Sequence, residues 1–321
     1  MSDAALASPA RARRAHANRL QEYGVYVAVA ALLLFNVAFT SNFLSLGNFR
    51  TQLVQVAPIV IVALGMALVI GTEGIDLSVG AVMALAAALI PLYLGYGLVP
   101  ALAMALIAGL VAGVLNGVLV AYVGIQPIIA TLALLVGGRG LALVMAQGRL
   151  VDIHNPAFLN LGSGDLLGIP ISVVVAAVLA VLTGLLIRRT ALGRRIVAIG
   201  GNRSASALAG LPVRRVLVTV YAICGLLAAL AGVLATARLG AGDPADTGML
   251  MELSAITAVV VGGTPLSGGR VRVAGTVAGA LLMQLLYATM IKHNLPDSSA
   301  QMVQAAIIVV AVYVARERSG R

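Results

Sequence analysis

Apolar residues fill most of this chain in long blocks, and short polar stretches separate the blocks. A helix needs about 20 apolar residues to cross the hydrocarbon core of a bilayer. On that measure we expect spans near 24–40, 54–71, 78–95, 98–122, 126–146, 170–187, 216–237, 252–263, 273–291 and 300–315. Residues 252–263 are too few to cross unaided, so we expect a half-helix or a re-entrant piece there. The pattern predicts an all-α polytopic membrane protein with about ten transmembrane helices, some of them broken or re-entrant.

The two ends of the chain differ from this apolar body. Residues 1–22 are rich in alanine, arginine and serine, which predicts a flexible basic cytoplasmic tail. The apolar run that follows resembles the core of a signal peptide, but no clean cleavage site ends it, so we interpret it as a retained signal anchor. We therefore expect one transmembrane domain over 23–316 and a short cytoplasmic tail over 317–321.

Composition and charge agree with a membrane protein. The chain is 61% apolar and 10% charged, whereas soluble domains are about 45–50% apolar and about 25% charged. The net charge of +10 would suggest nucleic acid in a soluble protein, but here the arginines gather at segment ends and in one loop, without a basic stripe interleaved with aromatics. We therefore expect contact with membrane lipid and none with nucleic acid.

The arginines also orient the chain. Residues 188–215 hold seven arginines and no acidic residue, and they lie between two apolar blocks. Arginine and lysine are enriched in the cytoplasmic loops of membrane proteins. We therefore expect this loop, the N-terminal tail, the turn at 270–272 and the C-terminus on the cytoplasmic side, so that both termini are cytoplasmic.

Several kinds of catalytic or metal site are not expected. Lys292 is the only lysine, and no phosphate-cradling P-loop surrounds it, so the chain is not an ATPase by itself. Motifs of zinc proteases and serine hydrolases are absent, and so is a paired C-x-x-C. The lone cysteine, Cys224, lies in an apolar segment, and the histidines fall in a tail and two loops. We expect no enzymatic activity, no metal site and no cofactor on this chain.

A glycine-rich break, GTEGIDLSVG over 71–80, places Glu73 and Asp76 between two apolar blocks. Carboxylates at membrane depth cost several kcal/mol unless they face protein or water. Two interpretations stay open. In one, Asp76 caps the next helix at the cytoplasmic rim; in the other, Asp76 and Ser78 line a gate or a transport pathway.

A second break has a similar layout. The stretch ELSAITAVVVGGTPLSGG over 252–269 is an apolar run that begins with Glu252 and ends in glycines, and a further helix follows. We interpret the two breaks as a remote internal repeat. Paired broken helices in two halves of a transporter indicate its pathway, so Glu252 is also a gate or pathway candidate.

The central loop contains signals for a short helix. Asn202 is a good N-cap, Gly210 a good residue to follow the last turn, and Pro212 forbids continuation. These signals predict about two helical turns. The small side chains of that helix suit insertion into a groove of a partner; the alternative is a capped connector on the membrane surface.

At these positions the chain resembles a known family. Residues 43–314 resemble the permease subunit of bacterial sugar ABC importers, the branch that includes ribose, xylose, arabinose and galactose permeases. Three blocks carry the resemblance, namely GIDLSVG at 74–80, LGRRIVAIGGNRSASALAGL at 192–211 and ELSAITAVVVGGTPLSGG at 252–269. A further match, Q-x-x-x-A-T-L…R-G, begins at Gln126.

The resemblance implies a multi-pass protein of the bacterial inner membrane that pairs with a second permease copy as a homodimer or heterodimer. It implies a cytoplasmic ABC ATPase that binds ATP and Mg, and a periplasmic or lipid-anchored sugar-binding protein. In that family the central loop is the coupling helix that docks on the ATPase. The corresponding residues here are Gly200, Gly201, Asn202, Arg203, Ala205, Leu208 and Gly210.

Three positions depart from the family pattern. Arg203 stands where relatives often have an acid, Glu73 where glycine is usual, and Ser254 where aspartate is typical. The exchange at Glu73 and Ser254 suggests either a compensated pair or an unusual substrate.

The resulting hypothesis is alternating-access import of a monosaccharide, a pentose or a hexose. Asn116 and Gln126 are candidates for contacts with sugar hydroxyls, and their alternative is an interhelical hydrogen bond. The rival is an ion-coupled secondary transporter that uses Glu73, Asp76 and Glu252. Two features argue against the secondary transporter. These acids have no basic partner near them in the sequence, and a secondary transporter does not need the capped helix in the central loop.

Overall fold

The computed structural model describes residues 9–316, and the side chains of 24–309 apart from positions 297, 300 and 308. This part of the chain forms thirteen α-helices, one π-helical turn and four two-residue strands. The helices that follow the predicted spans are α1 (Pro9–Phe39), α2 (Leu46–Gly71), α3 (Val79–Leu94), α4 (Leu98–Val118), α5 (Pro127–Met145), α7 (Ile171–Arg189), α10 (Val213–Leu239), α11 (Met251–Val261), α12 (Val273–Lys292) and α13 (Asp297–Arg316). The other elements are η1 (Leu119–Val123), α6 (Pro156–Ser163), α8 (Ala191–Gly201), α9 (Arg203–Leu208), β1 (Val151–Asp152), β2 (Asp165–Leu166), β3 (Ile169–Pro170) and β4 (Ala241–Gly242).

Each predicted span coincides with one helix, and the protein is an all-α membrane protein. Among the described residues, six helices are long and apolar enough to cross a bilayer: α2, α4 with η1, α5, α7, α10 and α12. The apolar part of α1, together with α3 and α11, is shorter. The expected short helix near 252–263 is confirmed, since α11 has 11 residues. The number of crossings stays a prediction.

Two helical segments differ from the expectations. Helix α1 begins at Pro9, so residues 9–22 continue a helix and do not form the predicted tail. Proline is favoured in the first turn, and the alanines, arginines and leucine that follow are good helix formers. Helix α8 in the central loop was not predicted; Thr190 Oγ1 caps it by accepting from the Gly193 N–H at 3.1 Å. Residues 1–8 and the predicted tail over 317–321 lie outside the described residues.

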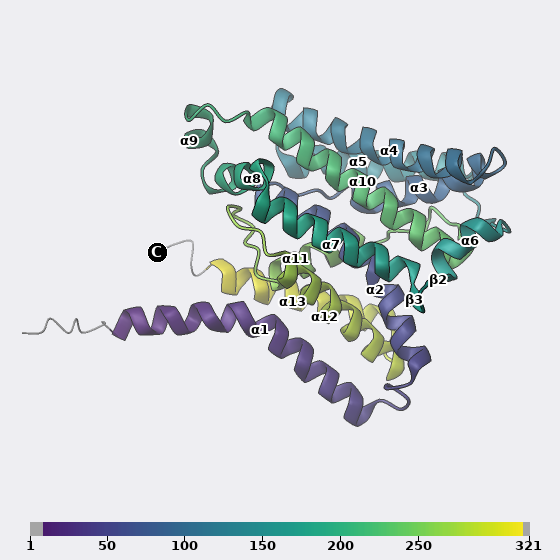
Figure 1. Cartoon of the computed structure of the whole chain (residues 1–321), viewed down its shortest axis with the longest axis horizontal. Helices are drawn as coiled ribbons and strands as arrows, with labels where there is room; N and C mark the ends of the chain where they lie inside the picture. The colour runs from purple at the N-terminus through teal and green to yellow at the C-terminus, as the bar shows by residue number, and fades with distance from the viewer. Residues whose placement is uncertain (1–8, 317–321) are drawn as a thin grey trace, which may run out of the picture.

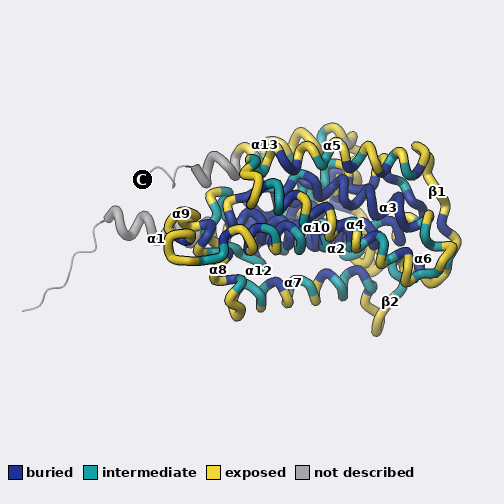
Figure 2. Tube along the Cα trace, turned by 90° about the horizontal axis from the view of Figure 1, so that it is seen from above, coloured by how far each residue is buried: buried dark blue, intermediate teal, exposed yellow. Residues whose placement is uncertain are grey.

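The long helices lie side by side along the longest axis of the molecule (Figure 1). Helices α2 and α10 pack against each other at the centre, and Figure 2 shows the buried residues concentrated along them and α3. Their packed surfaces are aliphatic, with alanine and glycine where helices approach closely. Small residues permit that approach in lipid, where apolar surfaces have no hydrophobic drive to associate.

The packing divides most of the chain into two similar halves. Helix α3 packs against α4 and α5, and α11 packs against α12 and α13. Helix α10 packs against α3 and α4, while α2 packs against α11 and α12. In these contacts α2 corresponds to α10, α3 to α11, α4 to α12 and α5 to α13. The break before α3 therefore corresponds to the connection before α11. The predicted repeat had instead matched the break before α3 with the glycines after α11.

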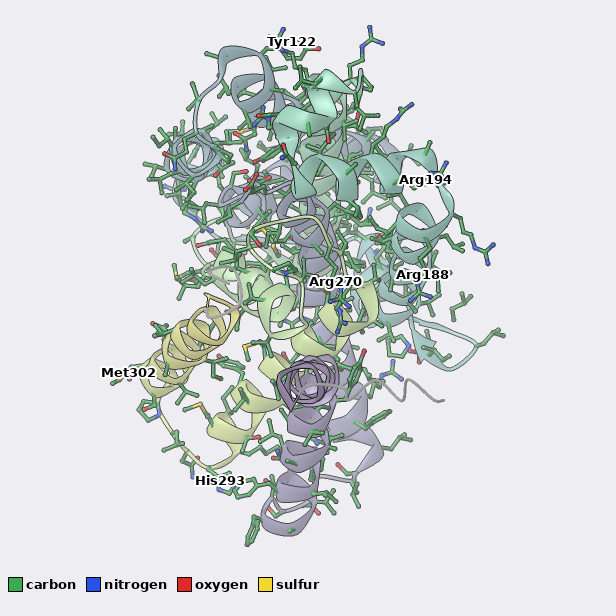
Figure 3. All side chains as sticks on the ribbon, turned by 90° about the vertical axis from the view of Figure 1, so that its left-hand side faces the viewer. Tyr122, Arg188, Arg194, Arg270, His293 and Met302 are labelled. Atoms are coloured by element: carbon green, nitrogen blue, oxygen red, sulfur yellow. The ribbon has the colours of Figure 1, made fainter. Side chains whose placement is uncertain are left out.

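The connections gather at the two ends of the bundle. One end carries α6 and the two-stranded pairs, and there Arg50 of α2 binds Asp165 through hydrogen bonds of 2.6 and 2.8 Å. The opposite end, which we call the basic end, carries α8 and α9 (Figure 1). Figure 3 faces the basic end and shows Arg188, Arg194 and Arg270, which come from three separate elements. The predicted cytoplasmic loops therefore lie together, and the side of the membrane that they face stays a prediction.

Candidate functional site

Helix α9 protrudes from the basic end and has the predicted caps. Asn202 Oδ1 accepts from the Ala205 N–H at 2.8 Å, and Gly210 has φ +77° after the last turn. The Leu211 N–H donates back to the Ser206 carbonyl at 3.0 Å, which closes the helix. The short capped helix is thus confirmed.

The surface of α9 is almost fully accessible. Arg203, Ala205 and Gly201 are exposed, and the Leu208 side chain is 91% exposed. An exposed leucine on a short helix contributes nothing to the core of its own chain. It is available to a partner with an apolar groove.

Gly200, by contrast, lies inside the molecule. A Cβ on this residue would collide with the Gly71 carbonyl oxygen and with the Gly269 nitrogen. The Gly269 N–H also donates to the Gly71 carbonyl at 3.2 Å. The end of α8 is therefore packed against both glycine-rich breaks, one after α2 and one after α11. We call this contact of Gly71, Gly200 and Gly269 the glycine junction.

The helices that enter the two breaks end in the same way. After α2, the Glu73 and Gly74 N–H groups donate to the Ile70 and Val69 carbonyls at 2.9 and 3.1 Å. After α11, the Gly263 and Thr264 N–H groups donate to the Val260 and Val259 carbonyls at the same two distances, 2.9 and 3.1 Å. This is the Schellman cap, which requires a left-handed residue. Glu73 and Gly263 take that place, with φ of +68° and +87°.

Asp76 lies in a buried polar cluster in the first break, in which Asn116 Oδ1 has no partner among the described residues. Asp76 Oδ1 accepts from the Ser78 N–H at 3.0 Å and from Ser78 Oγ at 2.6 Å. Asn116 of α4 donates to Ser78 Oγ at 2.9 Å and to Asp76 Oδ1 at 3.5 Å. All three residues are buried. The cluster links α4 to the turn before α3.

This arrangement differs from one of the two interpretations of Asp76, the helix cap at the cytoplasmic rim. Asp76 is 1% exposed, and its carboxylate binds the N–H of Ser78, the residue before α3, and not an N–H of the first helical turn. Asn116 binds the turn before α3 through Ser78 and Asp76, and its contact with a sugar hydroxyl stays a prediction. Gln126 precedes α5, where its side chain is exposed and makes no cap bond.

Glu252 lies in the first turn of α11 and is 8% exposed. Its Oε2 has no hydrogen-bond partner among the described residues. The charge of Arg139 acts on this carboxylate, and the Arg139 guanidinium donates to the carbonyls of Pro244, Ala245, Thr247 and Gly80 at 2.9–3.3 Å. Arg139 comes near from a distant part of the chain, but its hydrogen bonds go to backbone carbonyls, and no ion pair joins it to Glu252 among the described residues.

A cavity of about 640 Å³ lies between α2, α10, α11, α12 and α13, with Met83 of α3 and residues 246–250 in its lining. The sequence did not predict this site. None of Asp76, Ser78, Asn116, Gln126 and Glu252 lines it. Its polar lining residues are Gln55, Arg238, Asp246, Thr247, Ser254, Gln284, Tyr287, Gln301 and Gln304.

Glutamines dominate the hydrogen bonding in and beside this cavity. Gln284 of α12 donates through Nε2 to Gln52 Oε1 at 2.9 Å and to Gln55 Oε1 at 2.7 Å, both on α2. Gln304 of α13 donates through Nε2 to Ser254 Oγ of α11 at 3.1 Å. The signal that could have revealed them is the pairing of amides three residues apart in apolar helices, at 52 and 55 and at 301 and 304, since such residues share one helix face.

Comparison with known proteins gives a consistent result. A family model described as the permease component of the branched-chain amino acid transport system matches residues 48–312. The chain is 41% identical to the galactofuranose transporter permease protein of Escherichia coli K12 over 82% of this chain and 78% of that protein. It is 39% identical to the ribose import permease protein of Bacillus subtilis 168 over 94% of each chain. It is 34% identical to the L-arabinose ABC transporter permease protein of Azospirillum brasilense over 97% and 91%. No solved structure matches the chain.

Proposed function

The chain belongs to this family of transport permease components, and on that premise we propose that it is the membrane subunit of an ABC importer for a monosaccharide, a pentose or a hexose. As a permease it is a transport subunit and not an enzyme. The names of its relatives support a sugar, since they are permeases for galactofuranose, ribose and arabinose. The bacterial inner membrane is the location that such relatives support.

The partners follow from the same proposal. A separate ATPase binds ATP and Mg at the basic end, which faces the cytoplasm together with both termini. A periplasmic or lipid-anchored sugar-binding protein delivers the substrate at the opposite end. A second permease copy, identical or not, completes the membrane unit.

The glycine junction is the observation that carries the coupling mechanism. Helix α9 exposes Leu208 and Ala205 to a partner, while Gly200, just before α9, contacts both breaks. Closure of the ATPase moves α9, and because the backbones at the junction are in direct contact, Gly71 and Gly269 must move with it. The helices that follow the breaks then change the side to which the bundle opens.

Uptake into membrane vesicles tests this function. The vesicles hold ATP, the ATPase, this permease and the binding protein, and a protonophore collapses the proton gradient. Sugar uptake is expected to continue. Uptake that stops while ATP is plentiful would instead support the ion-coupled transporter with Glu73, Asp76 and Glu252, which the family membership does not favour.

A further inference from the structure

The cavity among α2, α10, α11, α12 and α13 has the size of a small-molecule site. Its volume of about 640 Å³ lies within the range of about 300–1,000 Å³ that is typical of ligand pockets. It opens inside one copy of the chain and is separate from the buried Asp76 cluster. The walls come from helices on both sides of the central α2–α10 contact.

The amides of the cavity keep unused hydrogen-bonding capacity. Gln55 Oε1 accepts a hydrogen bond from Gln284 at 2.7 Å. The N–H groups of the Gln55 amide have no acceptor among the described residues. Gln304 donates to Ser254 at 3.1 Å, and no donor to its Oε1 appears within the described part of the chain. An amide both donates and accepts without net charge, as a hydroxyl group does. The free groups therefore match the hydroxyls of a polyol.

The remaining lining suits an uncharged ligand that passes through. Arg238 and Asp246 carry opposite charges, so neither sign prevails in the lining. Five of the ten methionines line the wall: Met83, Met249, Met251, Met283 and Met290. Methionine is flexible and polarizable and adapts to ligands of different shape.

We propose that Gln55, held in place by its hydrogen bond from Gln284, and Gln304 form a binding site for the hydroxyl groups of an uncharged monosaccharide inside each permease copy. This inference rests on the proposed function and names where the sugar is held during transport. A sugar hydroxyl that accepts from Gln304 Nε2 replaces the hydrogen bond to Ser254 Oγ. One hydrogen bond is exchanged for another, so the net gain in binding free energy is small. Binding is therefore weak, as a transport path requires.

The test uses the complete importer in proteoliposomes with internal ATP, and D-ribose and D-galactose as the probes. Gln55→Leu and Gln304→Leu keep much of the side-chain volume and remove the amide. Each is expected to lower the uptake rate about two- to tenfold, the effect of one neutral hydrogen bond. Gln147→Leu makes the same change at an exposed turn after α5 and is expected to keep the wild-type rate.

A second measurement separates binding from folding. The ratio of ribose to galactose uptake does not depend on how much permease is folded, because both sugars use the same molecules. We expect the ratio to change in Gln55→Leu or in Gln304→Asn, which keeps the amide and moves it by one methylene. If the wild type imports the sugars and all three variants keep its uptake rate and its ribose-to-galactose ratio, the proposed site is wrong. The proposed function as a sugar importer would not be affected by that result. A wild type that imports neither probe with ATP, but takes up L-leucine, would instead refute the sugar importer.

Discussion

Glu73 holds a left-handed backbone conformation that favours glycine. Its φ is +68°, and its side chain is exposed, so few contacts offset the strain. We predict that Glu73→Gly raises the free energy of unfolding by up to about 1 kcal/mol, because it relieves the backbone strain. The gain is reduced by the larger conformational entropy that glycine gives to the unfolded chain. Thermal unfolding of the purified protein in detergent measures this change.

The matching residue in the second break provides the control. Gly263 has φ +87° and the same place in the Schellman cap. Gly263→Glu should lower the melting temperature, because it introduces the strain that Glu73→Gly removes. If both substitutions shift the melting temperature in the same direction, the backbone conformation is not the cause.

Gly200 is predicted to tolerate no side chain. A methyl group there would collide with the Gly71 carbonyl and the Gly269 nitrogen, and overpacking of this kind costs about 1–3 kcal/mol. Gly200→Ala should therefore lower the melting temperature and reduce ATP-driven uptake by separating α8 from the breaks. Gly184→Ala in α7 is the matched control, since its Cβ would meet nothing within 4 Å. Equal behaviour of the two variants would exclude the glycine junction as the coupling contact.

Among the elements, those with local signals were predictable from the sequence. Asn202, Gly210 and Pro212 predicted α9 because caps and helix breaks depend on neighbouring residues alone. Helix α8 was not predicted, although Thr190 caps it, because three of its 11 residues are glycines, which have a low helix propensity. The ten helices that follow the expected spans were predictable from length and hydropathy, which need no tertiary structure, while the number of crossings stays a prediction.

The candidate sites were less predictable, because they depend on which helices meet. Gln55 and Gln284 are separated by 229 positions, and their hydrogen bond exists only because α2 packs against α12. Gly200 was expected on the docking surface with its neighbours, but helical rotation turns it toward Gly71 and Gly269. Composition reveals neither contact.

At the scale of one element, α9 is predicted to bind the ATPase through its exposed apolar side chain. Leu208→Glu places a charge where an apolar groove should receive leucine, and burying an unpaired charge is costly. The variant should lose at least about tenfold in ATPase association, measured by co-purification, with the permease folded as in the wild type. Leu167→Glu changes an equally exposed leucine, 97% exposed in the β2–β3 turn at the opposite end, and should leave the association unchanged. Association that survives Leu208→Glu would mean that α9 is only a connector.

At the scale of the whole molecule, the two ends of the bundle are predicted to face opposite sides of the membrane. The arginine-rich connections and α9 lie at one end, and β2, β3 and the Arg50–Asp165 pair lie at the other. Since basic loops stay in the cytoplasm, Leu208 should be inside and Leu167 outside. This orientation also places α9 on the ATP side.

The single native cysteine makes this orientation easy to test. Cys224 is fully buried in α10, so it should not react with a thiol reagent that cannot cross the membrane. Leu167→Cys should be labelled in spheroplasts, whereas Leu208→Cys should be labelled only after the membrane is permeabilised, since both positions are more than 90% exposed. The reverse pattern would invert the topology and would place α9 where no ATPase can reach it. The coupling role of the glycine junction would fail with it, because its proposed input comes only from the cytoplasm.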